Sequence, residues 1–573
     1  MTSGTVRRVN GPRADALQAD MKTRHLLLPL GCALLTACQS RTNVSATGNA
    51  PAVYTHVYLT VTQIGFNASA TASPSASGWT SFTLTAPQTL DLVALANGGL
   101  AQLTNQLSVN AGSYAQMRVV LADTAAALTA SAQAAGAQSN NEVDYYDVNG
   151  TLQQAPLQVV NFAQGIGFSA SLDIVGQNVL SGAASSSAAS SSSSASSSAP
   201  TTTVLVDFDA TRDLTPLSLN GQAAFLLSPH PFAVDQPHAG IIQGQLNLSG
   251  VALNSAGVAD VQVAAETLSA DGTRHVVAQT TLASSSGSFS LYPLSTATGQ
   301  PTQYDLVIHG PAITTVIVKS VPVASGTPGS GTAQLGTITL IAATPFAVNV
   351  NGSQPVSPSS AAVGFYQTLP LSGEVPYLVE QRATDPTSGV FAQDQQLSAG
   401  GLEYATFSST GASPTLSSAT PAEGQSSYRL AALNPAWGEG TLNTLVAPAA
   451  GGATALFTVG ALPPPSGATI DSINGNLQVG GNGSYNQGAL MLTYNGALVA
   501  AASLNSLLGG SAGTLAAAVP GGAGGSIYSP GVYYAEVWVW NSSNPSGTLT
   551  RVPYGSAVDL SSGGISGLTL SAP

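Results

Sequence analysis

Apolar and polar residues alternate along most of the chain, in short runs that turn residues separate. One clear run places Val57, Leu59 and Val61 on one face of an extended segment, and its phase shifts before Ile64. Side chains of a strand point alternately to opposite faces, so this run predicts a half-buried strand with a bulge near Gln63. Further strands are predicted at 79–84, 89–95, 114–121, 157–162, 168–175, 204–208 and 223–227. Short strands between Gly, Pro and Asn turns predict an all-β fold of serial β-sandwich modules, Ig-like or transthyretin-like.

Breaks in this pattern divide the chain into four predicted modules, at residues 52–236, 240–343, 344–463 and 467–573. Residues 181–200 are almost only Ser and Ala, which bury too little apolar surface to offset the entropy of ordering. They are interpreted as a disordered insertion in the first module, either a bare spacer or a site of O-linked glycans. Residues 38–51 are rich in Thr, Asn, Ser and Ala, which predicts a flexible tether.

The N-terminal region has the pattern of a secretory signal. A basic start at Met21 to His25 precedes an apolar run from Leu26 to Leu35, too short for the roughly 20 residues of a membrane-spanning helix. The segment Leu35-Thr36-Ala37-Cys38 resembles a bacterial lipobox, whose cysteine receives a diacylglyceryl group and becomes the first mature residue. We therefore expect residues 1–37 to be absent from the mature chain, and Cys38 to be the lipidation site.

Charge and cysteine content narrow the function classes. Charged residues make up 7% of the chain, against roughly 25% in ordinary soluble proteins. From Cys38 onward eight basic and 24 acidic residues remain, a net charge of -16, which argues against nucleic-acid binding because phosphates need clustered cations. The two cysteines are Cys32 and Cys38, so processing would leave no thiol for a disulfide.

Two resemblances to known families follow from ordered motifs. The run Val57 to Phe66, then Leu90-Asp91-Leu92, Gly112-Ser113-Tyr114 and Val206-Asp207-Phe208-Asp209 resemble the bacterial lipoprotein family called domain of unknown function 4382, over residues 52–236. That resemblance implies a secreted β-sandwich and assigns no activity. Residues 240–343 resemble a carboxypeptidase regulatory-like, transthyretin-like domain, although the usual Asp-Gly turn before Phe is Ser286-Gly287 here.

Carboxylate and nucleophile patterns are weak evidence for an enzyme. Asp207 and Asp209 lie two residues apart, so on a strand their carboxyls share a face about 6.5 Å apart, within the range of a glycosidase pair. Solvated acids, or acids that meet Arg212, explain them better. The Gly509 to Gly513 segment matches a serine-hydrolase elbow, but the last histidine is His309 and the triad base would normally follow it. We predict no catalytic residue, no metal site and no cofactor.

Aromatic residues of the last module could form a sugar-stacking platform. Tyr534, Trp538 and Trp540 share one face of a predicted strand, because side chains alternate with period two. If that face is exposed, it is a ligand platform; if it is interior, it is core. The opposite face is apolar as well, which favours the core interpretation.

These observations predict a non-enzymatic lipoprotein of the bacterial envelope, with a structural or surface-binding role. Gln39, rather than Asp, at the second mature position favours the outer membrane, with the body facing the periplasm or the cell surface. Expected partners are the membrane, through the lipid, and glycans or another envelope protein. A carbohydrate-binding or adhesion role is the alternative, and a glycosidase that uses Asp207 and Asp209 ranks third.

Overall fold

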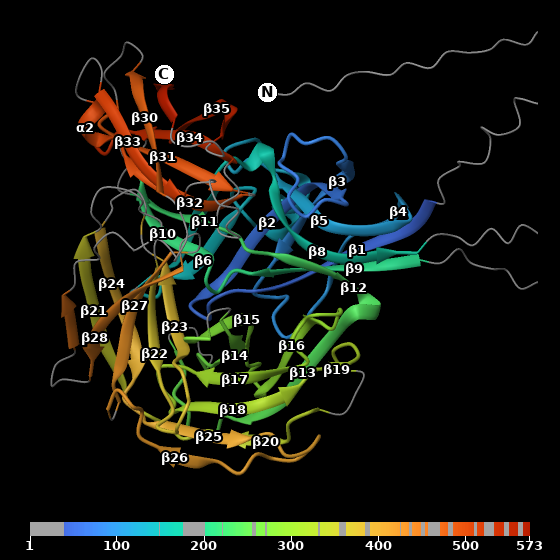
Figure 1. Ribbon diagram of the computed structural model, residues 1–573, viewed down its shortest axis with the longest axis vertical. Coiled ribbons are helices and arrows are strands. Elements are labelled where there is room, and N and C mark those ends of the chain that lie inside the picture. Colours follow the sequence, from blue (N-terminus) through green and yellow to red (C-terminus); the bar gives the residue numbers. More distant parts are fainter. Residues whose placement is uncertain are drawn as a thin grey trace, which may run out of the picture.

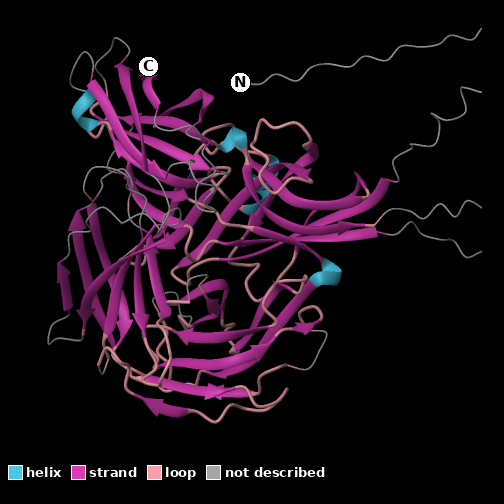
Figure 2. Ribbon diagram, in the orientation of Figure 1, coloured by secondary structure: helices cyan, strands magenta, loops and turns pink. Residues whose placement is uncertain are grey.

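The computed structural model describes residues 39–572 except for several short segments. Those outside the description are 148, 176–200, 220–221, 255–258, 270–271, 330–332, 354–361, 384, 386–389, 425, 435–437, 448–452, 457–469, 480–484, 495, 509–512, 521–531, 544–548 and 560–564. Strands dominate the described chain, and its helices are short (Figure 2). The all-β prediction is confirmed. No helix in these residues is long and apolar enough to cross a membrane.

The first module folds one 12-stranded mixed sheet over a single apolar core. The strand order is β10-β11-β7-β6-β2-β5-β8-β12-β9-β1-β4, and β3 pairs with β2 (Figure 1). The predicted bulge is confirmed, because the β2 register shifts between Val61 and Gln63. The elements are β1 (Gln39–Asn49), β2 (Tyr54–Asn67), β3 (Thr80–Asp91), β4 (Ala101–Asn110), β5 (Gly112–Leu121), α1 (Ala130–Ala135), β6 (Glu142–Tyr146), β7 (Leu152–Val159), η1 (Phe162–Gln164), β8 (Ile166–Ile174), β9 (Thr201–Asp209), β10 (Leu214–Leu219), β11 (Gln222–Leu227) and β12 (Phe232–Asp235).

The stretch predicted as a tether is a strand, so that prediction is wrong. Strand β1 pairs antiparallel with β4 and parallel with β9, which makes it an interior strand of the sheet. Val44 and Ala46 are fully buried in the core. A strand paired on both sides needs few apolar residues of its own, because its neighbours satisfy its backbone hydrogen bonds.

The second module packs two sheets around a core of Val, Leu and Ile. Its elements are η2 (Gln236–His238), β13 (Ala239–Asn247), β14 (Gln262–Leu268), β15 (His275–Leu282), β16 (Ser288–Ser295), β17 (Gln303–His309), β18 (Thr315–Pro322), β19 (Ala324–Ser325) and β20 (Thr337–Thr339). One sheet holds β16, β13, β19 and β20. The other begins β15-β14-β17-β18 and continues into strands from the third module.

The third module forms a three-stranded sheet, β24-β21-β29, and a four-stranded sheet, β23-β22-β27-β28, around one core. Its elements are β21 (Pro345–Ser353), β22 (Ala362–Gln367), β23 (Tyr377–Ala383), β24 (Val390–Ser398), β25 (Leu402–Thr406), β26 (Ser417–Ala419), β27 (Tyr428–Asn434), β28 (Gly438–Val446) and β29 (Ala453–Leu456). Strand β25 pairs parallel with β18, and β26 follows it (Figure 1). Hydrogen-bonded strands therefore cross the predicted boundary at residue 343.

The last module has the sheets β33-β30-β36 and β32-β31-β34-β35. Its elements are β30 (Ile470–Val479), β31 (Gln487–Tyr494), β32 (Ala497–Ser503), α2 (Asn505–Leu508), β33 (Gly513–Pro520), β34 (Val532–Trp540), β35 (Thr550–Asp559) and β36 (Ile565–Ala572). Although last in sequence, it packs against the first module, since one buried cluster joins Val160, Leu217 and Leu226 to Met491 and Trp538. The modules thus pack against one another and are not independent domains in a linear series.

Candidate functional site

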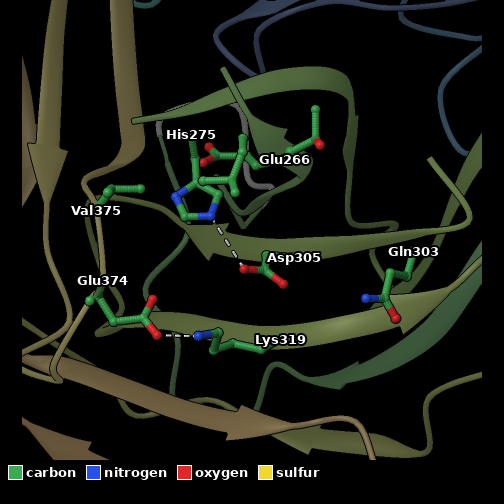
Figure 3. Close-up of a pocket in the computed structure, with 10 residues that line it drawn as sticks. Glu266, His275, Gln303, Asp305, Lys319, Glu374 and Val375 are labelled. Atoms are coloured by element: carbon green, nitrogen blue, oxygen red, sulfur yellow. Dashed lines mark hydrogen bonds and ion pairs between the residues drawn. The ribbon is translucent and has the colours of Figure 1, made fainter. Parts of the chain in front are cut away.

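A polar cleft of about 280 Å³ opens between the second and third modules. Strands β14, β15, β17 and β18 form one wall, and the loop before β23 forms the other (Figure 3). The lining residues are Glu266, Thr267, Leu268, His275, Gln303, Asp305, Lys319, Gly373, Glu374 and Val375.

Strand irregularities position the two acids of the second module. Glu266 and Asp305 are directly opposite each other on β14 and β17. The β14–β15 register shifts at Ala265/Glu266, and the β17–β18 register shifts between Tyr304 and Leu306, around Asp305. A bulge re-aims the side chains next to it, and bulges are frequent beside functional sites. Two carboxyls therefore face each other across neighbouring strands.

The environments of these acids push their pKa values apart. Burial, reinforced by the Asp305 charge, raises the pKa of Glu266 well above its usual value, despite a hydrogen bond from the Leu378 backbone. Burial also acts to raise the pKa of Asp305, but hydrogen bonds from His275, Ser320 and Tyr377 outweigh it, and the pKa lies below its usual value. The cleft thus pairs an acid whose pKa is raised with one whose pKa is lowered, a pattern typical of sites that bind or move protons.

Asp305 is the centre of a network with two aromatic rings. The nitrogen His275 Nε2 lies 3.4 Å from Asp305 Oδ2, and the Tyr377 hydroxyl lies 2.8 Å from the same oxygen. The His275 and Tyr377 rings stack with centroids 3.8 Å apart and an interplanar angle of 10°. Burial, then the charge of Asp305, raises the pKa of Tyr377, so it stays a phenol that can donate.

An ion pair joins Lys319 of β18, in the first wall, to Glu374 in the opposite wall. The Tyr377 hydroxyl also lies 3.1 Å from Glu374 Oε2, which links the two walls. Lys319 is the only lysine from Cys38 onward. The cleft therefore holds charges of both signs, with hydrogen-bond donors and acceptors side by side.

Two buried polar atoms of this cluster have no hydrogen-bond partner among the described residues. They are Glu266 Oε1 and His275 Nδ1, whereas Glu266 Oε2 accepts from the Leu378 backbone nitrogen at 3.3 Å. A buried polar atom without a partner costs free energy, and such groups occur at sites of function or bound water. The second and third modules therefore meet at a polar contact in which these two buried atoms lack hydrogen-bond partners among the described residues.

Glu266→Gln is expected to remove a pH dependence of stability. The usual pKa of this group is 4.5, and the folded state raises it. The unfolded chain releases the proton first as pH rises, so wild-type stability falls between that value and the folded-state pKa. Glutamine does not titrate. The melting temperature of the variant should therefore equal or exceed that of the wild type near neutral pH, and this difference should disappear below about pH 4. An equal loss at every pH would contradict this expectation.

The structure buries the three aromatic residues that could have formed a platform, as the favoured core interpretation expected. Tyr534, Trp538 and Trp540 are 7%, 0% and 4% exposed. The opposite face of β34 packs in the last module's own core, while both tryptophans pack against the first module. Stacking of a sugar needs an accessible ring face, so these residues form no platform in this arrangement.

Asp207 and Asp209 lie at the contact between the first and second modules. Gln279 Nε2 donates to Asp207 Oδ2 at 3.1 Å, and Thr280 donates to Asp209 Oδ2 from its nitrogen and its hydroxyl, at 3.0 and 2.7 Å. Burial, then the neighbouring Asp209, raises the pKa of Asp207. These acids hold β15 against the first module. Asp207 is buried, not solvated, and the charge of Arg212 acts to lower its pKa.

Other acids and histidines of the chain lie apart from the cleft. Asp147 accepts from the nitrogens of Asn149 and Thr151, which makes it a turn residue. His230 and His238 pair with Asp213 and Asp235 at the two ends of β12. Among the described residues, no group of three or more His, Cys, Asp or Glu could hold a metal ion. Cys38, residues 181–200 and most of the Gly509 to Gly513 segment lie outside the description.

Sequence reasoning missed the cleft. Its five ionisable residues, Glu266, His275, Asp305, Lys319 and Glu374, come from four strands and a loop and share no motif spacing. A usable signal was the rarity of charge, because Glu266 and Asp305 lie in mainly apolar strands of a chain with only 7% charged residues.

Comparison with known proteins bears on the first module. Residues 41–229 match the family model described as Domain of unknown function (DUF4382). This match begins inside β1 and ends before β12, in agreement with the predicted resemblance. It covers about a third of the chain and leaves the resemblance of residues 240–343 to a carboxypeptidase regulatory-like domain as a prediction.

The other comparisons add little. No curated protein matches the chain. A solved leucine-rich repeat protein from Bacteroides thetaiotaomicron is similar at 11% identity and a TM-score of 0.12, over 40% of this chain and 27% of that one. The chain thus spans about a quarter of that protein's length, and so low a score carries no argument about fold or function.

Proposed function

We propose that this protein is a non-enzymatic lipoprotein of the bacterial envelope, anchored to the outer membrane through Cys38. The observation that carries the proposal is the lipobox-like segment Leu35-Thr36-Ala37-Cys38 after a short basic and apolar signal. Acylation buries several hydrocarbon chains at about 0.8 kcal/mol per CH₂, enough for stable anchoring. The DUF4382 match is consistent with this role, since the resembled family consists of bacterial lipoproteins.

The hydrogen bonds of Asp207 and Asp209 favour a binding role over a glycosidase. Both carboxylates already accept hydrogen bonds from β15 of the second module. The two carboxyls of a glycosidase must instead face the scissile bond of a sugar. The glycosidase alternative rested on an accessible pair of carboxyls, and these two carboxyls are already engaged with β15.

Cys38→Ser is expected to abolish membrane association. Serine lacks the thiol that accepts the diacylglyceryl group, and the acidic body has no other anchor in the proposal. Palmitate labelling and membrane fractionation in a bacterial host check this, with wild type and Cys32→Ser as controls. The Cys32→Ser chain should still be labelled, because Cys32 lies within the signal. Undiminished labelling of Cys38→Ser would overturn the proposal.

Carbohydrate binding is the second candidate function. The cleft is a better candidate for the sugar site than the two tryptophans of β34, because those are buried. Glu266 with its raised pKa, Asp305 with its lowered pKa and the Lys319–Glu374 ion pair offer both donors and acceptors. Hydroxyl-rich neutral molecules suit such a surface because each hydroxyl both donates and accepts. The volume of about 280 Å³ suits one or two sugar rings.

Gln303→Ala is expected to weaken glycan binding without changing stability. Gln303 is exposed at the rim of the cleft, so its loss removes a ligand contact and little packing. A glycan array should use unlipidated protein that begins at Gln39, because a later start would remove part of β1. Gln63→Ala, a half-buried glutamine outside the cleft, is the matched control. Equal glycan binding by both variants would remove the cleft as the sugar site.

A further inference from the structure

The start of β1 leaves almost no free chain after Cys38. Gln39 is the first residue of β1, and it pairs with Asn110 of β4. Two residues later Arg41 pairs with Ser108 on one side and Thr201 on the other. Neighbouring Cα atoms are about 3.8 Å apart, so a lipid on Cys38 would lie one peptide away from a fixed sheet.

Several other strand ends lie around this position (Figure 1). Strand β4 ends at Asn110, β5 begins at Gly112, and β8 ends at Ile174 opposite Gly112. Strand β9 begins at Thr201, beside Arg41. We call this group the anchor edge; it comprises Arg41, Asn110 to Ser113, Val175 and Thr201.

The side chains of the anchor edge suit a lipid headgroup layer. Arg41 is exposed, and no described residue gives its guanidinium an ion-pair or hydrogen-bond partner. It is one of eight cations in a chain whose net charge after Cys38 is -16. Val175 is 58% exposed, an apolar side chain at the same edge. The exposed Arg41 can meet lipid phosphates, and the exposed Val175 can meet the upper part of the acyl chains.

We propose that the anchor edge lies in the headgroup layer of the membrane, so that the lipid fixes the orientation of the body. This inference rests on the proposed lipidation of Cys38. The headgroup layer is about 5–8 Å deep on each side of the bilayer, and a strand rises about 3.3 Å per residue, so about two residues of β1 lie within it.

The same orientation holds the cleft away from the membrane. The far end of β1 contacts the second module, where Asn49 Nδ2 donates to Thr280 Oγ1 of β15 at 3.2 Å. Ten residue steps separate Asn49 from Gln39, or about 33 Å along the strand. Strand β15 also supplies His275 to the cleft. The lipid therefore presents the cleft to ligands beyond the headgroup layer.

Site-directed fluorescence tests this orientation. Processing removes Cys32 and lipidation consumes the Cys38 thiol, so one introduced cysteine gives a single label. The full lipidated protein is reconstituted into vesicles of phosphatidylethanolamine and phosphatidylglycerol that contain a nitroxide-headgroup lipid. The labelled variants are Asn110→Cys and Val175→Cys at the anchor edge, and Asn149→Cys as the matched control. Asn149 is an exposed asparagine in the turn between β6 and β7, and β6 pairs with the start of β2, five residues beyond Asn49.

The proposal predicts a several-fold greater loss of fluorescence at positions 110 and 175 than at position 149. A flexible Gly/Ser insertion after Gln39 should reduce the loss at both edge positions while vesicle flotation persists. Equal fluorescence loss at the three positions, in protein that floats and carries palmitate, would overturn the fixed edge and leave lipidation standing. Failure to float or to incorporate palmitate would overturn both proposals.

Discussion

Glu536→Ala should destabilise the protein by roughly 3–5 kcal/mol, because it removes the nearer and more buried of the two acids that pair with the buried cation Arg551. Glu536 is 2% exposed, and its Oε1 accepts from Arg551 Nε at 3.2 Å. Its Oε2 accepts from the Asn161 nitrogen at 2.9 Å, across the contact between the last and first modules. Arg551 also donates to the Val159 carbonyl oxygen at 2.6 Å, so it cannot turn to solvent without breaking a second contact. Urea unfolding measures the loss.

Two further variants separate the buried charge from general packing. Glu536→Gln keeps an oxygen acceptor but loses the charge, and should cost less than alanine. The double variant Glu536→Ala with Arg551→Met should recover part of the loss, because removal of both charges leaves neither one buried alone. A double variant as unstable as the sum of the single variants would contradict the ion-pair explanation.

Trp538→Ala should cost roughly 3–5 kcal/mol and leave no specific defect in glycan binding. The indole is fully buried, packs with Val160 and Leu226 of the first module, and donates through Nε1 to Glu536 Oε2 at 3.1 Å. Its removal leaves a cavity between the modules, so the last module should melt in a separate and earlier calorimetric transition.

Trp79→Ala is the matched control for this loss. Trp79 is half-exposed in the first module and stacks with Arg118, so its truncation removes less buried area. It should lower the melting temperature less and leave the last module docked. Wild-type melting of Trp538→Ala together with lost glycan binding would contradict the burial of this side chain and restore the aromatic platform.

The fold class could be predicted from sequence because sandwich strands carry a local signal. Val57, Leu59 and Val61 alternate with polar residues, and the phase change at Gln63 is the bulge seen between β2 and its neighbours. Strand β1 has only Val44 and Ala46 as buried apolar anchors, so its order depends on β4 and β9, which are distant in sequence. Local composition could not distinguish it from a tether.

Contacts between modules had no comparable signal. The sequence required one apolar face of β34 to be interior, but both faces are buried because the first module covers the second face. Asp207 and Asp209 likewise read as an exposed pair until β15 is placed against them. The cleft depends on bulges in β14 and β17 and on a loop near Glu374. Tertiary pairing alone brings these residues together.

Mass spectrometry of the N-terminal peptide can decide whether Cys38 carries the lipid. The protein is expressed as the full chain in a bacterial host, extracted from the membrane fraction with detergent and digested. Lipidation predicts a mature N-terminus at Cys38, followed by Gln39, with the mass of a diacylglyceryl thioether on the cysteine. An N-terminus at Met1 or Met21, or an unmodified Cys38 in membrane-extracted protein, would contradict it.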